Sequence, residues 1–233
     1  MPEYTGTGTR AAMPQQITAA EFIAQARLAL GDAGETPTWS DAELLLFLNE
    51  AIREVSQHLP RLAETHLTAV AGARRYGLPV DTAAVLSVEY PEGREPACTL
   101  TRRPYKSRRF AVSGDAYDFL PRHDLTAAPA LLLSFDPAAG ETLLVRHTRP
   151  HAAVATVNDT LTVPAEYQHV LAGYVLFAAA RQLQAAEQAA PTGGSLLMGQ
   201  LAANARRHEL AYLNALNRIL TQRQGESGVV VWG

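Results

Sequence analysis

The sequence predicts an α+β protein, in which an antiparallel bundle of about four helices is interrupted by an inserted antiparallel β-rich region. Apolar residues recur every three to four positions near both ends of the chain, whereas short β-branched runs fill its middle. Each helical half has an apolar face that needs a partner, so the two halves are expected to pack together. The bundle is assigned to 17–62 and 163–224, the inserted β-rich domain to 63–162, and extended arms to 1–16 and 225–233.

The bulk composition describes a folded protein with a core. The chain has 233 residues, of which 47% are hydrophobic and 18% are charged. A formal net charge of −3 gives no overall basic field, so wrapping of nucleic acid around an outer face is not expected. Cys98 is the single cysteine, which excludes an intrachain disulfide and a cysteine-based zinc site. No apolar run approaches the ~20 residues that span a bilayer, and residues 1–16 lack the apolar core of a signal peptide, so no membrane partner is expected.

Two capped helices are predicted in the first 60 residues. Thr18 and Glu21 have the spacing of a capping box, in which each side chain accepts a backbone hydrogen bond from the other residue. They open a helix from residue 19 to about residue 30. Ser40 and Glu43 repeat this pattern before an amphipathic helix that Pro60 ends. The predicted core positions of the second helix are Leu45, Leu48, Ile52 and Val55.

The middle of the chain is predicted to form five or six antiparallel strands. Between residues 65 and 156 the short apolar runs are separated by turn signals such as Pro-Glu-Gly at 91–93 and Asp-Pro-Ala-Ala-Gly at 136–140. The stretch 101–119 is basic and irregular. Its apolar residues follow neither the 3.6-residue period of a helix nor the two-residue alternation of a strand.

Two further helices are predicted after the β-rich region. Pro164 suits the first turn of a helix that is apolar on nearly all sides and continues to about residue 190. Ser195 then opens a last helix, which continues to about Gln224. The predicted core positions of these two helices are Tyr174, Phe177, Leu201, Tyr212 and Leu216.

No arrangement of residues indicates an enzyme. Glu166 and His169 have the spacing of a metal-ligand pair on one helical face, but a di-iron site needs a second such pair and two more carboxylates. His147 and His151 are four residues apart, yet Pro150 prevents a helix there, so their rings need not converge. We therefore predict no catalytic residue, no metal ligand and no cofactor. A small metal-dependent hydrolase is the less favoured alternative.

One run of basic side chains is a candidate for contact with nucleic acid. It is interleaved with Tyr105 and Phe110, and basic and aromatic residues together can hold phosphates and stack bases. A solvated loop or a subunit contact explains the same run, and a nucleic-acid-binding module that uses it is an alternative function. Its members are Arg102, Arg103, Lys106, Arg108 and Arg109.

The end of the chain is a candidate docking segment. Four consecutive apolar residues follow a glycine-containing lead, and leaving them in water is unfavourable. A partner could bury them by adding a strand to its own sheet or by receiving the tryptophan in an apolar pocket. These docking residues are Val229, Val230, Val231 and Trp232.

Three stretches and their order support a family resemblance. They are WSDAELLLFLNEAIREV, RRYGLPVDTAAVLSVEY and, after a β stretch, LTVPAEYQHVLAGYVLFAAA. Over residues 17–224 this arrangement resembles the head-to-tail connector (adaptor) proteins of tailed bacteriophages, in which a helical bundle has a β-rich insertion. The insertion is long compared with that of the smaller family members.

The resemblance implies a structural virion protein of the phage neck, assembled in the host cytoplasm. It implies a dodecameric homo-oligomeric ring beneath the portal protein, which joins the portal to a tail or nozzle protein. Double-stranded DNA is then expected to pass through the lumen transiently and without sequence preference. The C-terminal extension of this family reaches toward the portal, so residues 225–233 are expected to dock there.

Overall fold

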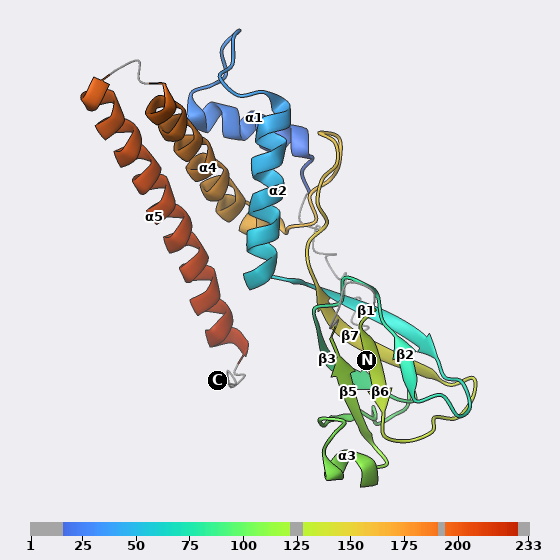
Figure 1. Ribbon diagram of the computed structural model, residues 1–233. Coiled ribbons are helices and arrows are strands. Elements are labelled where there is room, and N and C mark those ends of the chain that lie inside the picture. The colour runs from blue at the N-terminus through green and yellow to red at the C-terminus, as the bar shows by residue number, and fades with distance from the viewer. Residues whose placement is uncertain (1–15, 122–127, 191–193, 228–233) are drawn as a thin grey trace, which may run out of the picture. The chain divides into compact units, whose positions relative to one another are not determined.

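The computed structural model describes residues 16–121, 128–190 and 194–227, which form two compact units (Figure 1). One unit contains the described residues up to 55 and from 152 onward, and the other contains 56–151. The elements in chain order are α1 (Ala19–Leu30), α2 (Asp41–His58), β1 (Arg61–Thr68), β2 (Arg75–Gly77), β3 (Ala84–Glu89), β4 (Thr101–Arg102), α3 (Arg108–Val112), β5 (Ala116–Leu120), β6 (Ala130–Leu133), β7 (Thr142–Arg149), the 3-10 helix η1 (Ala165–Tyr167), α4 (Gln168–Ala189) and α5 (Gly194–Ser227). The α+β prediction is confirmed.

Both predicted capping boxes are present. Thr18 Oγ1 accepts a hydrogen bond from the backbone N–H of Glu21 at 3.2 Å, and Glu21 Oε2 accepts one from the backbone N–H of Thr18 at 2.8 Å. Ser40 and Glu43 make the same exchange at the start of α2. Gly31 ends α1 with φ at +69°, a left-handed conformation that glycine adopts without strain. Local sequence therefore determines where these helices begin and where α1 ends.

A buried carboxylate holds the loop between α1 and α2. Asp32 accepts hydrogen bonds from the backbone N–H groups of Thr38 at 2.5 Å and Trp39 at 3.2 Å. Its carboxylate also lies 2.9 Å from the Arg27 guanidinium. Burial raises the pKa of Asp32, but the hydrogen bonds and the Arg27 charge outweigh this effect and hold the pKa below its usual value. The fixed loop places Trp39 against Phe47 of α2, with ring centroids 5.7 Å apart.

In the helical unit, α4 lies between α2 and α5 (Figure 1). Gly173 of α4 is where α5 comes closest, because a Cβ atom at this position would lie 3.3 Å from the Cα atom of Tyr212. The ring of Tyr174 meets the ring of Tyr212 edge-on at 5.4 Å. On the other side, the side chain of Glu43 in α2 hydrogen-bonds to Gln182 of α4. Helix α1 also contacts α4.

Carboxylates of α2 lie within electrostatic range of the α4–α5 contact. Burial raises the pKa of Tyr212 to about 12, and the negative charge of Glu54 adds to the rise. Burial also raises the pKa of Tyr174, with further contributions from Glu50 and Glu54. Both phenols therefore keep their protons to a higher pH than an ordinary tyrosine does.

The predicted core positions of the helices differ in burial. Leu44, Phe47 and Ala51 are buried together with most of the predicted stripe of α2. The middle of the buried face therefore lies on the Leu44 side of the predicted stripe, and Leu45 is at its edge. Among the predicted positions, Leu48, Ile52, Val55, Tyr212 and Leu216 are buried, whereas Leu45, Tyr174, Phe177 and Leu201 are partly exposed.

Residues 152–162 lie in the helical unit, although the sequence pattern assigned them to the inserted domain at 63–162. The side-chain amide of Asn49 in α2 donates to the carbonyl of Val154 and accepts from its N–H, both at 2.8 Å. These bonds join an extended segment to a helix more than 100 residues earlier, which no local pattern indicates. The compact β-rich unit is therefore 56–151.

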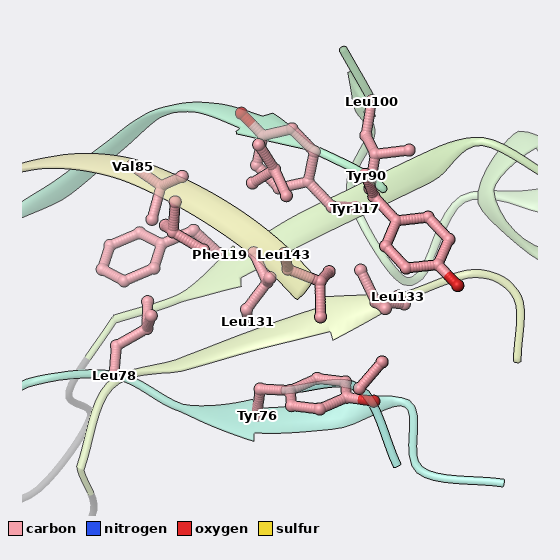
Figure 2. Packing of buried hydrophobic residues seen from close by; sticks show 13 residues of the cluster. Tyr76, Leu78, Val85, Tyr90, Leu100, Tyr117, Phe119, Leu131, Leu133 and Leu143 are labelled. Atoms are coloured by element: carbon pink, nitrogen blue, oxygen red, sulfur yellow. The ribbon is translucent and has the colours of Figure 1, made fainter. Parts of the chain in front are cut away.

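The β-rich unit consists of two sheets around one core (Figure 2). Strands β1, β7 and β3 form an antiparallel sheet in that order, and β2, β6, β5 and β4 form the second. The strands are antiparallel, as expected, except for the parallel pair β4–β5. The described residues of this unit form seven strands instead of the five or six expected, because β2 and β4 are too short to show a period. The shared core contains Ala69, Tyr76, Leu78, Val85, Val88, Tyr90, Leu100, Tyr117, Phe119, Leu131, Leu133, Leu143 and Val145.

The three-stranded sheet has a single irregularity among its described pairings. Strand β7 is central, and Arg149 at its end lies opposite Arg61 at the start of β1. The pairing of β3 with β7 shifts between Val85 and Ser87. This bulge leaves Leu86 exposed on a strand whose other apolar residues are largely buried.

Candidate interaction surfaces

The basic cluster of residues 102–109 begins at the last residue of β4 and continues along the connection to β5, which includes the short helix α3. Ser107 Oγ accepts a hydrogen bond from the backbone N–H of Phe110 at 3.2 Å and so caps α3. The side chain of Phe110 is buried and anchors this helix. Arg108 and Arg109, which precede it, are exposed.

A carboxylate organises the first half of this connection. Asp118 Oδ2 accepts a hydrogen bond from the backbone N–H of Tyr105 at 2.9 Å. Its Oδ1 atom lies 3.9 Å from Arg102 Nε, so part of the Arg102 charge is compensated. Lys106 Nζ lies 5.6 Å from the centre of the Tyr105 ring, within cation–π range. The cations of the cluster that are most available to a partner are therefore Arg103, Arg108 and Arg109.

Two arginines of the cluster share a shallow depression. Arg103 and Arg109 line it with Val112 and Ser113. The buried Nε atom of Arg103 has no hydrogen-bond partner among the described residues. Paired guanidinium groups suit phosphate or carboxylate oxygens, because their planar N–H groups can donate two hydrogen bonds at once. The structure thus brings together cations that the sequence showed only as neighbours in a run.

The residues considered as metal ligands make other contacts. His147 Nε2 lies 3.0 Å from Thr65 Oγ1, and His151 Nε2 lies 3.0 Å from the carbonyl oxygen of Leu59. Within the part of the chain that the structure describes, no three His, Cys, Asp or Glu side chains are grouped so that they could hold a metal ion.

The predicted docking residues Val229, Val230, Val231 and Trp232 lie outside the described residues. Helix α5 continues through Gly225 to Ser227. The glycine-containing stretch that was expected to begin at 225 and to precede the docking residues is therefore helical in its first residues. The docking role of the last six residues stays a prediction.

Four described leucines on helices are exposed and were not recognised from the sequence: Leu28, Leu46, Leu210 and Leu213. Leu46 of α2 is 57% exposed and Leu210 of α5 is 43% exposed, and each lies on the side of its helix away from the buried stripe. Leu46 follows two other leucines, and only its angular position on the helix could have distinguished it.

None of the described helices is both long and apolar enough to cross a membrane. A family model described as SU10 adaptor protein matches residues 17–232. A search of curated proteins found no match.

Proposed function

Because the chain belongs to the SU10 adaptor protein family, a family of phage head–tail adaptors, we propose that it forms a ring beneath the portal and joins the portal to the tail or nozzle. The observation that carries this proposal is the match over residues 17–232, which covers both helical segments and the β-rich unit. Membership of the family supports a structural protein of the virion neck that interacts with portal and tail proteins. We propose a dodecamer, assembled in the host cytoplasm, with double-stranded DNA passing transiently through its lumen.

The helical unit is proposed as the body of this ring. Helices α1, α2, α4 and α5 would act as a four-helix bundle, with α4 at its centre. Leu46 on α2 and Leu210 on α5 are left for contacts outside the subunit. No catalytic residue or cofactor is assigned, because the proposed function is assembly.

The test of the ring is a mass measurement of the purified protein, alone and mixed with portal. We expect a complex that contains about one adaptor for each portal subunit. The subunit alone is expected to remain monomeric if the portal acts as the template. A complex with a single adaptor copy per portal ring, or electron micrographs of intact particles that lack the protein at the neck, would contradict the proposal.

We predict that the C-terminal segment docks on the portal. Deleting residues 228–233 should weaken binding to portal at least tenfold, because the segment supplies strand hydrogen bonds or the indole of Trp232. The thermal midpoint should not change, since α5 ends at Ser227. Binding is measured with immobilised portal. A chain with the last six residues in scrambled order is the matched control. Unchanged affinity of the deletion variant would show that the docking surface lies on the helices instead.

We propose that the basic cluster contacts the tail-side partner or the DNA backbone. Reversing Arg108 and Arg109 to glutamate should lower infectious yield at least tenfold without a change in thermal midpoint, because both side chains are exposed. The matched control reverses Arg75 and Arg94, which are also exposed in the β-rich unit. Equal yields from the two double variants would show that the cluster has no special role.

A nucleic-acid-binding module is the second candidate function, and the depression lined by Arg103 and Arg109 favours it. Tight, salt-sensitive binding of double-stranded DNA by the isolated chain would support this candidate. Weak binding that becomes detectable only in the portal complex would support the adaptor.

A further inference from the structure

The connection between β4 and β5 is fixed by hydrogen bonds on both sides of its basic depression. The backbone N–H of Arg103 donates to the carbonyl of Tyr117 at 2.8 Å, before α3. The backbone N–H of Ser113 donates to the carbonyl of Phe110 at 3.2 Å, where α3 ends. The side chain of Phe110 is buried between these two points. The side chains that line the depression therefore extend from a backbone whose position is set before any partner arrives.

The two guanidinium groups of the depression have no anionic partner in the described part of the chain. Arg102 of the same run lies 3.9 Å from Asp118, but neither Arg103 nor Arg109 forms an ion pair with a described residue. The Nε atom of Arg103 also lacks a hydrogen-bond partner among these residues. An oxyanion in the depression could accept hydrogen bonds from both groups at once.

An apolar side chain lies beside these cations. Val112 lines the same depression and is 79% exposed. It follows Arg109 by three positions, which places both residues on one side of α3. Phosphate contacts to a DNA backbone would not require this apolar group, whereas a protein segment could cover it with an apolar side chain of its own. Arginine beside exposed apolar and aromatic side chains is also typical of protein interfaces, and Tyr105 of the same connection is 43% exposed.

The surrounding charges favour a single carboxylate over a polyanion. Asp115 is exposed, and it accepts a hydrogen bond from the hydroxyl of Ser113, which lines the depression. Asp118 is also only partly buried. Duplex DNA presents a row of phosphates, and two carboxylates on the same connection lower the positive potential that such a row requires. A single carboxylate needs only the two arginines.

We propose that this depression binds an aspartate or glutamate side chain of the tail-side protein, with an apolar side chain of that protein against Val112. Arg103 and Arg109 donate hydrogen bonds to the carboxylate oxygens and supply the specificity of the contact. This inference rests on the proposed function, in which the chain joins the portal to a tail. It selects a protein, and not the DNA backbone, as the partner of the basic cluster.

Photo-cross-linking from position 112 tests the occupant. The full chain with p-benzoylphenylalanine in place of Val112 is assembled into phage particles and irradiated, and the linked molecule is identified by mass spectrometry. We expect a link to a protein that is also present in purified tails. A link to DNA, to the portal protein or to a second copy of this chain overturns the proposal. The absence of a link in particles of normal composition also overturns it.

Lysine substitution separates hydrogen-bond geometry from charge. Arg103→Lys with Arg109→Lys keeps both charges but removes the planar sets of N–H donors. We expect attachment of purified tails to DNA-filled heads to fall at least tenfold, while the isolated chain binds double-stranded DNA as before. Arg75→Lys with Arg94→Lys, at two other exposed positions of the β-rich unit, is the matched control. Unchanged tail attachment overturns the proposal, and a parallel loss of DNA binding overturns it in favour of the DNA backbone.

Replacing Val112 with asparagine tests the apolar part of the contact. Val112→Asn should lower tail attachment at least threefold and leave the subunit's thermal midpoint unchanged, because the side chain is already exposed. Val80→Asn is the matched control, since Val80 is 65% exposed in the same unit. Equal tail attachment by the two valine variants overturns the proposal.

Portal binding separates this inference from the proposed function. The lysine and asparagine variants should all assemble on portal to the same mass as the unchanged chain. Normal assembly together with normal tail attachment refutes the inference and leaves the adaptor role intact. An unchanged chain that binds portal in a single copy, or that is absent from the neck, overturns the proposed function and the inference with it.

Discussion

Replacing Leu48 with alanine should lower the free energy of unfolding of the helical unit by about 2–5 kcal/mol, the range for removing a buried leucine and leaving a cavity. Leu48 has no exposed surface and lies at the middle of the buried face of α2. The effect is large because the surrounding helices cannot close the space that the side chain leaves. Trp39 contacts Phe47 of the same helix, so its fluorescence reports unfolding of this unit when Trp232 is replaced by phenylalanine.

The matched control for this prediction is Leu46→Ala, two residues earlier on the same helix. Leu46 is 57% exposed, so the same chemical change should alter stability by less than about 1 kcal/mol. Equal effects of the two substitutions would show that α2 is not packed as the structure describes.

Replacing Gly173 with leucine should destabilise the helical unit by about 2–3 kcal/mol, as expected when extra atoms are forced into a close contact. A single Cβ atom at this position would already lie 3.3 Å from Tyr212 Cα, and a backbone atom cannot move aside as a flexible side chain can. Helix α5 would have to move away from α4, which would also separate the edge-to-face pair Tyr174–Tyr212. Chemical denaturation followed by circular dichroism at the helical band measures the change.

Gly199→Leu is the matched control for Gly173. Gly199 is an exposed glycine in α5, and a Cβ atom there would meet no atom within 4 Å. Because leucine favours the helix over glycine, this substitution should stabilise by about 0.5–1 kcal/mol. Opposite signs at the two glycines would demonstrate the close approach of α4 and α5. Stabilisation at both positions would contradict it.

Features that depend on neighbouring residues could be predicted from the sequence. The capping boxes at Thr18 and Ser40, the end of α1 at Gly31 and the end of α2 before Pro60 are each set by a few adjacent side chains. The order of helical and β-rich segments was also readable, because periods of 3.6 and 2 residues persist over many positions. That order supported the resemblance to phage adaptors, and the family match confirms it.

The candidate surfaces were only partly predictable. The basic run from Arg102 to Arg109 is visible as composition, but its pairing with Asp118 and the depression shared by Arg103 and Arg109 are not. The position of Glu50 and Glu54 within electrostatic range of Tyr174 was not predictable either, because it depends on neighbours that only the fold supplies.

The sequence by itself determined the fold class, the helix ends and the family of this protein, since local hydrogen bonding and periodicity suffice for these. Only the tertiary structure decided three further features. They are the parallel pairing of β4 with β5, the union of residues 152–162 with α2 through Asn49, and the contact at Gly173. Each depends on segments that are distant in the chain or lack a period of their own. Their free energy comes from packing and hydrogen bonds formed after the chain has folded, and no local pattern records which distant partner a residue will meet.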